Sequence, residues 1–257
     1  MNRLSRLFGN IINLKGWRRM KSIIALLIFT ICLNVNTIQA SEKVGVLLMH
    51  GKGGTSLPKS PIGPLIKFLK SKGVLIFAPQ MPWSRERGFD KTYKESMAEI
   101  DEKVKKLRKK GASKIIVAGH SIGANAALGY GAIYNGIDGI IAIAPGHIPE
   151  ATEFQNLIGN DWKRAKKMVE SGNGDKKEKF KDVNQGRKTK KRMRADVYLS
   201  WFDPNGPAVM PVNTSNLKPG VPLLWILGEK DRMYKIGKSY AFSKAPSNSK
   251  NAYIVVK

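Results

Sequence analysis

The sequence predicts an α/β fold, a doubly wound and mainly parallel sheet with helices on both of its faces. Three observations predict it. Short apolar runs rich in β-branched residues alternate along the chain with longer stretches of helical periodicity. These runs are apolar at nearly every position, which is typical of strands buried on both faces. The length of 257 residues is enough for one sizeable core.

The first half of the chain alternates strand and helix. Strands are predicted at 43–49, 74–79 and 114–119, and helices at 61–73 and 91–111. A glycine closes each helix, and the second helix has basic last turns, which suit the negative end of its dipole. The apolar faces of the two helices consist of Ile62, Leu65, Ile66 and Leu69, and of Met97, Ile100, Val104 and Leu107.

The second half continues the pattern after an interruption. A helix rich in small residues is predicted at 121–134, and strands at 137–145, 221–231 and 251–257. Residues 150–205 contain no clear strand, so we expect a small helical cap inserted between two strands. Within it, the tract from Asp161 to Arg194 carries 14 Lys and Arg against 5 Asp and Glu.

Residues 1–40 are expected to be a signal peptide with a leader, followed by one domain at 41–257. From Met20 the chain has a basic start at Lys21, a short apolar run and a small residue, Ala40, at a plausible cleavage point. Met20 is the expected true start. The protein is therefore expected to be exported, to the periplasm or beyond the cell. The single cysteine, Cys32, lies in this leader, so no disulfide or thiol site is expected in the mature domain.

The segment Gly119-His120-Ser121-Ile122-Gly123 places a serine between a strand and a helix. A G-x-S-x-G sequence in this context predicts a tight bend that exposes the serine hydroxyl at the carboxyl edge of the sheet. The same position would also suit a serine that only caps the helix. Ser121 is the predicted nucleophile.

A glycine-rich loop follows the first strand at His50-Gly51-Lys52-Gly53-Gly54. Cleavage of an ester or amide passes through a tetrahedral oxyanion, which needs two preorganised hydrogen-bond donors. The backbone N–H groups of Lys52 and Ile122 are the predicted donors.

Asp231 follows the strand at 221–231 in the segment GEKD. A carboxylate there would orient a histidine and stabilise its protonated form. Glu229 is the second choice. Asp231 would also suit a purely structural cap of a following helix.

The three segments HGKGG, GHSIG and GEKD resemble the α/β-hydrolase superfamily in their order and in their positions at strand ends, over about residues 43–257. The resemblance is closest to small serine esterases and dienelactone hydrolases. It implies a serine nucleophile, an acid and a histidine base, acting without a metal or a cofactor. The expected reaction is hydrolysis of a carboxylic ester or a related acyl bond.

The histidine departs from this pattern. The superfamily places it after the last strand, but here the last predicted strand ends at Lys257. His50 belongs to the glycine-rich loop and His120 adjoins Ser121, so neither is expected to be the base. We therefore expect a truncated member with little activity, since a serine without a base is a weak nucleophile. His147, in the segment APGHIPE, stays open as a base or as a pocket residue.

Several other residues are candidates for an apolar substrate pocket. Trp201 and Met210 lie in a segment rich in aromatic residues that returns from the cap, and Trp83 follows a strand end. His50 is a further candidate. A packed loop would explain the same residues.

The formal charge of +26 favours association with anionic surfaces. A membrane or a polysaccharide is the expected partner besides a small acyl substrate. Nucleic acid is not favoured, because the sequence contains no known nucleic-acid-binding module. A non-catalytic, exported basic protein that keeps the fold is the alternative function.

Overall fold

The computed structural model describes residues 42–56, 60 and 62–257. The predicted signal peptide, with Met20, Cys32 and Ala40, lies outside these residues. None of the described helices is long and apolar enough to cross a membrane.

The body of the protein is a six-stranded, entirely parallel sheet, which confirms the predicted fold class. Its strand order is β2-β1-β3-β4-β7-β8. Each predicted strand is present. The strands are β1 (Val44–Met49), β2 (Leu75–Phe77), β3 (Lys114–His120), β4 (Gly139–Ile143), β7 (Leu223–Gly228) and β8 (Ala252–Val256).

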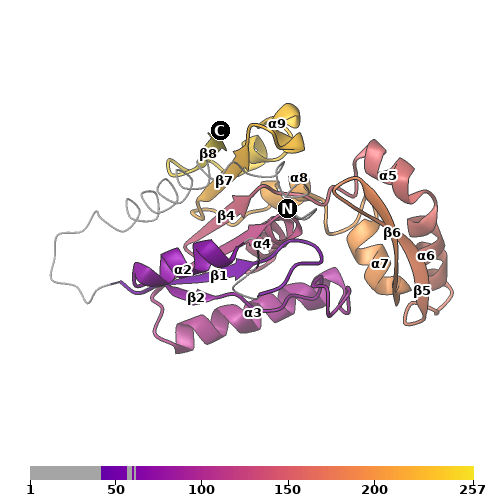
Figure 1. The fold of residues 1–257 in the computed structure, drawn as a ribbon, viewed down its shortest axis with the longest axis horizontal. Helices are drawn as coiled ribbons and strands as arrows, with labels where there is room; N and C mark the ends of the chain where they lie inside the picture. Colours follow the sequence, from indigo (N-terminus) through magenta and orange to yellow (C-terminus); the bar gives the residue numbers. More distant parts are fainter. Residues whose placement is uncertain (1–41, 57–59, 61) are drawn as a thin grey trace, which may run out of the picture.

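Helices cover both faces of the sheet (Figure 1). On one face, helix α2 packs on Val46, Leu48 and Ile116. On the other face, the larger core joins α3 and α4 to Leu47, Val117 and other residues of the alternate strand positions. The helices of the body are α2 (Gly63–Ser71), α3 (Tyr93–Lys109), α4 (Ile122–Ile133), α8 (Met210–Ser215), α9 (Arg232–Ile236) and the 3₁₀ helix η1 (Phe242–Lys244).

The predicted cap emerges from the carboxyl end of β4 and lies at one end of the sheet (Figure 1). It contains the helices α5 (Thr152–Ile158), α6 (Asp161–Glu170) and α7 (Ala195–Phe202). The expectation that residues 150–205 contain no strand is wrong. An antiparallel hairpin of β5 (Lys177–Asn184) and β6 (Arg187–Arg194) joins α6 to α7.

The hairpin is not evident in the sequence because its strands do not alternate polar residues with apolar ones. Basic residues alternate instead with a mixture of polar and apolar residues. Phe180, Asp182 and Met193 are buried on its inner face, and basic residues occupy the opposite face. The ring of Phe180 stacks on Tyr198 of α7 at 4.4 Å between centroids. These contacts hold the hairpin on the cap helices.

A buried carboxylate, Glu99 of α3, anchors the loop that follows β2. Arg87 donates two hydrogen bonds to Glu99, at 2.8 and 2.9 Å, and Lys91 lies 2.9 Å from the same carboxylate. Burial alone would raise the pKa of Glu99, but the hydrogen bonds from Arg87 and Lys91 outweigh it and lower the pKa to about 2. Trp83, fully buried, lies in the loop that this cluster holds.

The first prediction concerns stability against pH. The pKa of Glu99 is lower in the folded protein than in the unfolded chain. The carboxylate therefore stabilises the fold at pH values above the unfolded pKa, and this contribution is lost as the pH falls towards about 2. Glu99→Gln should lower the free energy of unfolding by about 2 kcal/mol near neutral pH and by much less near about pH 2–3. Urea unfolding at several pH values measures the difference. Glu102→Gln, at an exposed position of the same helix, is the control and should change stability by less than about 0.5 kcal/mol. A cost for Glu99→Gln that does not depend on pH would contradict the interpretation.

Candidate active site

Ser121 lies on a strained bend between β3 and α4. Its φ angle is 56°, in the left-handed region that residues with a side chain rarely adopt. Its N–H donates to the carbonyl oxygen of Ile143 at the end of β4, at 3.0 Å. Strain of this kind costs about 1–3 kcal/mol and gathers at functional sites.

Two glycines make the bend possible. A Cβ on Gly119 would lie 2.1 Å from the carbonyl carbon and oxygen of Gly123. A Cβ on Gly123 would lie 2.8 Å from the carbonyl oxygens of both Met49 and His50. Without side chains at 119 and 123, α4 begins in direct contact with the backbone of β3 and of the end of β1.

The loops after β1 and β4 flank the serine side chain. A Cβ on Gly51 would lie 3.3 Å from Cβ of Ser121, and one on Gly146 would lie 3.0 Å from Oγ of Ser121. The loop after β4 is itself strained, with φ of 41° at Ala144 and 69° at His147. Three of the five described non-glycine residues with positive φ therefore lie at or beside this bend.

Two N–H groups of the glycine-rich loop after β1 donate hydrogen bonds within the protein. Gly53 N–H donates to the carbonyl of Trp83 at 2.8 Å, and Gly54 N–H donates to that of Gly51 at 3.0 Å. Among the hydrogen bonds of the described residues, the N–H groups of Lys52 and Ile122 donate none. Ile122 opens α4, where N–H groups have no partner within the helix. Both N–H groups thus stay available to an acceptor beside Ser121.

His50 holds this loop in shape with both of its ring nitrogens. Met81 N–H donates to Nε2 at 3.0 Å, so the ring proton is on Nδ1, which donates to the carbonyl of Gly51 at 2.8 Å. The backbone carbonyl of His50 accepts from the indole of Trp83 at 2.8 Å. Burial lowers the pKa of His50, so the ring is neutral. This histidine is a structural residue of the loop.

His147 lies between the body and the cap. Its Nε2 donates to the carbonyl of Trp201 at 2.6 Å, and its Nδ1 has no partner among the described residues. The rings of Phe154 and Phe202 contact it edge-on, with centroids at 5.4 and 5.0 Å. Burial holds the pKa of His147 well below its ordinary value, and the nearby Lys52 lowers it further.

No hydrogen bond joins Ser121 to any of the three histidines in the described part of the chain. His120, next to the serine, packs with Nδ1 3.0 Å from the position of a Cβ on Gly51, and burial lowers its pKa. The structure therefore places the loop that carries Lys52 beside Ser121 through Gly51. The roles of Ser121 as nucleophile and of the Lys52 and Ile122 N–H groups as donors stay predictions, and no described histidine pairs with the serine.

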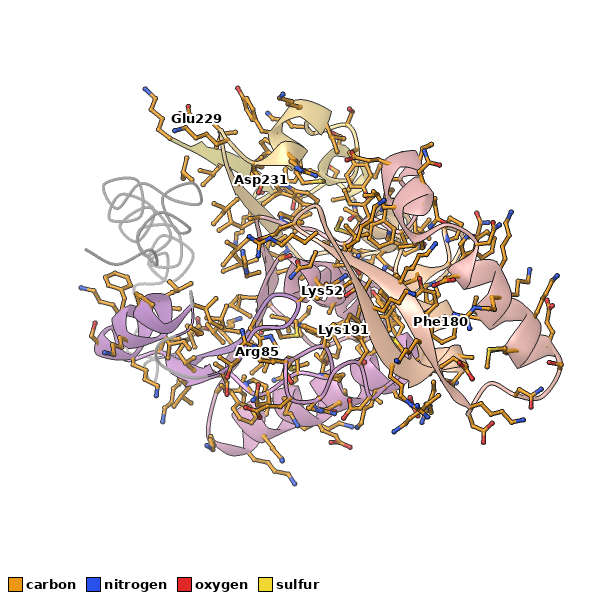
Figure 2. All side chains as sticks on the ribbon, turned by 45° about the vertical axis from the view of Figure 1, so that its right-hand side comes forward. Lys52, Arg85, Phe180, Lys191, Glu229 and Asp231 are labelled. Atoms are coloured by element: carbon orange, nitrogen blue, oxygen red, sulfur yellow. The ribbon has the colours of Figure 1, made fainter. Side chains whose placement is uncertain are left out.

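Asp231 caps helix α9 with its carboxylate. Oδ1 accepts from Met233 N–H at 2.8 Å, and partial burial raises the pKa of this carboxyl. Glu229, the second choice, is exposed and lies further out beyond the end of β7 (Figure 2). Asp231 is thus the inward-lying carboxylate at this strand end, and its role as the acid of a triad stays a prediction.

The predicted pocket residues lie in the core. Trp83, Trp201 and Met210 are fully buried. The rings of Trp83 and Trp201 meet edge-on at 5.5 Å between centroids, and Trp201 also contacts Tyr93 at 4.7 Å. These residues form an aromatic core between body and cap, which matches the packed-loop interpretation.

The side chain of Lys52 makes a contact that sequence reasoning missed. Its Nζ lies 2.6 Å from Asp182 Oδ1 of the hairpin and donates to the carbonyl of Val183 at 3.0 Å. The side chains of Lys52 and Asp182 are 7% and 1% exposed. Figure 2 shows Lys52 at the centre of the molecule. Three rings surround the ammonium group at 5.7, 5.9 and 5.1 Å from their centroids, those of Phe89, Phe154 and Phe202.

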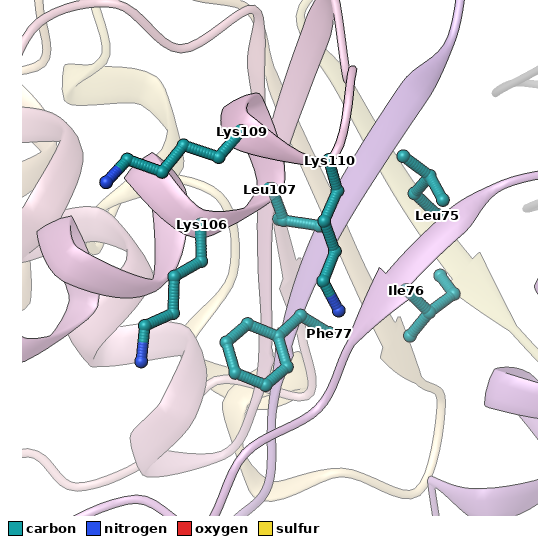
Figure 3. A pocket seen from close by; sticks show the side chains of 7 residues that line it. All are labelled: Leu75, Ile76, Phe77, Lys106, Leu107, Lys109 and Lys110. Carbon is teal, nitrogen blue, oxygen red and sulfur yellow. The ribbon is translucent and has the colours of Figure 1, made fainter.

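A hollow of about 250 Å³ lies elsewhere, between β2 and the end of α3 (Figure 3). It is lined by Phe77, Leu107 and Lys110, among others. The end of α3 leads into the amino end of β3, whereas Ser121 lies beyond the carboxyl end. This hollow is therefore not part of the candidate site. No group of three or more His, Cys, Asp or Glu side chains that could hold a metal is found within the described ranges.

The parallel sheet and the serine on its strained bend define an α/β-hydrolase. The model of the family described as "Serine aminopeptidase, S33" matches residues 83–256. The chain belongs to this family and is a hydrolase. Comparison with curated proteins gives no match.

Solved structures of lipases and esterases share the fold. A monoacylglycerol lipase from Paleococcus ferrophilus is 19% identical, with a TM-score of 0.58, over 82% of this chain and 83% of that one. The siderophore hydrolase EstB from Aspergillus fumigatus is 14% identical, with a TM-score of 0.59, over 85% and 84%. Est1E from Butyrivibrio proteoclasticus, solved with ferulic acid, is 19% identical, with a TM-score of 0.56, over 83% and 80%.

The second prediction tests the bend. Gly119→Ala places a methyl group against the backbone of Gly123 and should lower the free energy of unfolding by more than about 3 kcal/mol. Gly228→Ala is the matched control, because its Cβ would meet its nearest atom at 3.8 Å. That variant should lose less than about 1 kcal/mol. Denaturant unfolding measures both, and equal stability of the two variants would contradict the geometry.

The third prediction tests the link between loop and hairpin. Lys52→Met leaves the buried Asp182 carboxylate without its partner and should cost about 3–5 kcal/mol. Adding Asp182→Asn removes the unpaired charge, so the double variant should be more stable than Lys52→Met alone. Lys105→Met, which breaks an exposed pair with Asp101, is the control and should cost less than about 1 kcal/mol. Asp182→Asn is also measured alone. A double variant whose loss of unfolding free energy equals the sum of the losses in the two single variants would show that the pair is not coupled.

Proposed function

We propose that this hydrolase is a serine hydrolase and that it cleaves carboxylic esters at Ser121. The observation that carries the proposal is the bend itself. Ser121 has φ of 56° and lies beside the loop that carries Lys52. The N–H groups of Lys52 and of Ile122, the next residue, donate no hydrogen bond in the described part of the chain. The structural relatives named as a monoacylglycerol lipase and a siderophore hydrolase support ester rather than peptide substrates.

The chemistry follows from this placement. Ser121 Oγ attacks the ester carbonyl carbon, and its proton passes to a base. The carbonyl oxygen becomes an oxyanion that accepts hydrogen bonds from the N–H groups of Lys52 and Ile122. The C–O bond to the alcohol then breaks, the alcohol leaves with a proton, and water hydrolyses the acyl group from Ser121. Asp231 is the proposed acid that orients the base.

The weak point of the site is the base. His50 uses both of its ring nitrogens, and His147 donates to Trp201 with its Nε2 while its Nδ1 has no described partner. In the described part of the chain, neither of them nor His120 forms a hydrogen bond with Ser121. We therefore propose that the three histidines of this sequence do not activate Ser121. Loss of a triad histidine lowers turnover by up to about a million-fold, while the oxyanion hole and binding preserve about a thousand-fold over water.

The lack of an assigned base for Ser121 also supports a second candidate function. A chain in which no histidine bonds to Ser121 would suit a non-catalytic, exported protein that uses its basic surface to bind anionic material. The export itself is proposed on the sequence of residues 1–40 alone.

The fourth prediction separates the two candidates. The 257-residue chain should hydrolyse p-nitrophenyl acetate slowly. Added imidazole should raise the rate above that of imidazole without protein, in a saturable manner, because imidazole acts as the base for Ser121. Ser121→Ala should abolish this excess rate, and His147→Asn should leave it within about two-fold. Ser200→Ala, at a serine bound to Tyr93 N–H, is the control and should retain the rate.

Two outcomes would overturn parts of the proposal. No rate above that of imidazole alone, or an excess rate that survives Ser121→Ala, would remove Ser121 as the nucleophile and favour the non-catalytic candidate. Fast turnover without imidazole that is lost in His147→Asn would make His147 the base. Aminoacyl p-nitroanilides, tested beside the ester, would reveal a peptidase if they were the better substrates.

A further inference from the structure

The hairpin β5–β6 has two faces of opposite character. Its strands pair in register from Lys177 with Arg194 to Asn184 with Arg187. The inner positions include the buried Phe180, Asp182 and Met193, which pack on the cap and on Lys52. The alternate positions form the outer face, which consists of Lys177, Lys179, Lys181, Val183, Lys188, Lys190, Arg192 and Arg194.

Seven of these eight outer residues are basic, and none is acidic. Three rows place two cations directly opposite each other, as in the pairs Lys179 with Arg192 and Lys181 with Lys190. Like charges in directly opposed positions of an antiparallel pair are destabilising. The outer face therefore costs the fold some stability unless an anion neutralises it.

The protein itself neutralises little of this charge. Arg194 pairs with Glu95 and Asp196. The other six outer cations form no ion pair with any described residue, and all six are exposed. Lysine on an exposed edge strand also hinders aggregation, but that role does not require opposed cations in successive rows.

The shape of the surface favours a chain-like ligand. Beside the outer face, Lys181, Lys188 and Lys190 line a hollow of about 410 Å³ together with Asn156 and Leu157 of α5. Successive rows along an antiparallel strand repeat every two residues, or about 6.8 Å. A narrow ribbon with a hollow at its side suits an extended polymer better than a flat bilayer.

The composition of the face excludes two other polyanions as preferred partners. No aromatic residue lies on the outer face, so there is no platform for stacking the bases of a single-stranded nucleic acid. Val183, the one apolar member, is half-buried, so the face offers nothing to insert between lipid chains. The side chains are mainly lysines, which act as point charges rather than as the bidentate forks that favour phosphate.

We propose that the outer face of the hairpin binds an acidic polysaccharide, a linear glycan with repeated carboxylate or sulfate groups. The lysine rows neutralise successive anionic groups, and the hollow beside α5 accommodates one of its sugar units. This surface is separate from the candidate active site and does not depend on hydrolase activity.

The test compares two variants of the full chain that lose the same charge. The outer-face variant carries Lys179→Gln, Lys181→Gln, Lys190→Gln and Arg192→Gln. The control carries Lys67→Gln, Lys70→Gln, Lys106→Gln and Lys109→Gln, at exposed positions of α2 and α3. Binding to immobilised polygalacturonate and to heparin is measured over a series of salt concentrations, and circular dichroism checks that both variants fold.

The outer-face variant should bind about 10-fold or more weakly, with a shallower dependence on salt, and the control should stay within about two-fold of the parent protein. Polygalacturonate and heparin distinguish a carboxylated from a sulfated glycan as the natural type. Equal losses in both variants would mean that binding follows net charge alone and would overturn the proposal. Tighter binding to phosphatidylglycerol vesicles or to single-stranded oligothymidylate than to either glycan, at equal salt, would also overturn it.

Discussion

The contact on which the site depends is the close approach of the start of α4 to the carboxyl end of β1. Gly123 lies so near the carbonyls of Met49 and His50 that a Cβ there would be 2.8 Å from both oxygens. This contact fixes where α4 begins relative to the loop after β1. It therefore holds the bend at Ser121 close to the loop that carries Lys52. Packing of backbone on backbone acts there together with the hydrogen bond from Ser121 N–H to the carbonyl of Ile143.

Lys52 connects this geometry to the cap. Its backbone belongs to the loop beside Ser121, and its ammonium group is held by Asp182 of the hairpin. A pair this deeply buried is costly to separate, because either ion alone would be left without solvent or partner. Movement of the hairpin away from the body would thus be coupled to the position of the glycine-rich loop after β1. The inner face of the hairpin packs on the cap and on Lys52, and its outer face is exposed to solvent.

Much of the body could be predicted from the sequence because its signals are local. The glycines at 119 and 123 frame the serine within five residues, and the strand is apolar from Ile115 to Gly119. The hairpin could not be recognised by apolar alternation, because lysine occupies three of the four outward positions of β5. The alternation of Lys with Glu, Phe and Asp was the available signal. The Lys52–Asp182 pair joins residues 130 positions apart, which no local pattern reveals. Asp231 shows a different limit of prediction from sequence. One carboxylate can cap α9 and still lie where the acid of a catalytic triad is expected, so the sequence pattern does not separate the two roles.

The most direct measurement is a crystal structure of the chain after prolonged reaction with a fluorophosphonate in large excess, because a serine without a base reacts slowly. The phosphonyl group mimics the tetrahedral intermediate. The phosphorus should be bonded to Ser121 Oγ, with one phosphonyl oxygen about 2.7–3.1 Å from the backbone nitrogens of both Lys52 and Ile122. A phosphonate attached to another residue, or an oxygen turned away from these two nitrogens, would contradict the assignment of the site.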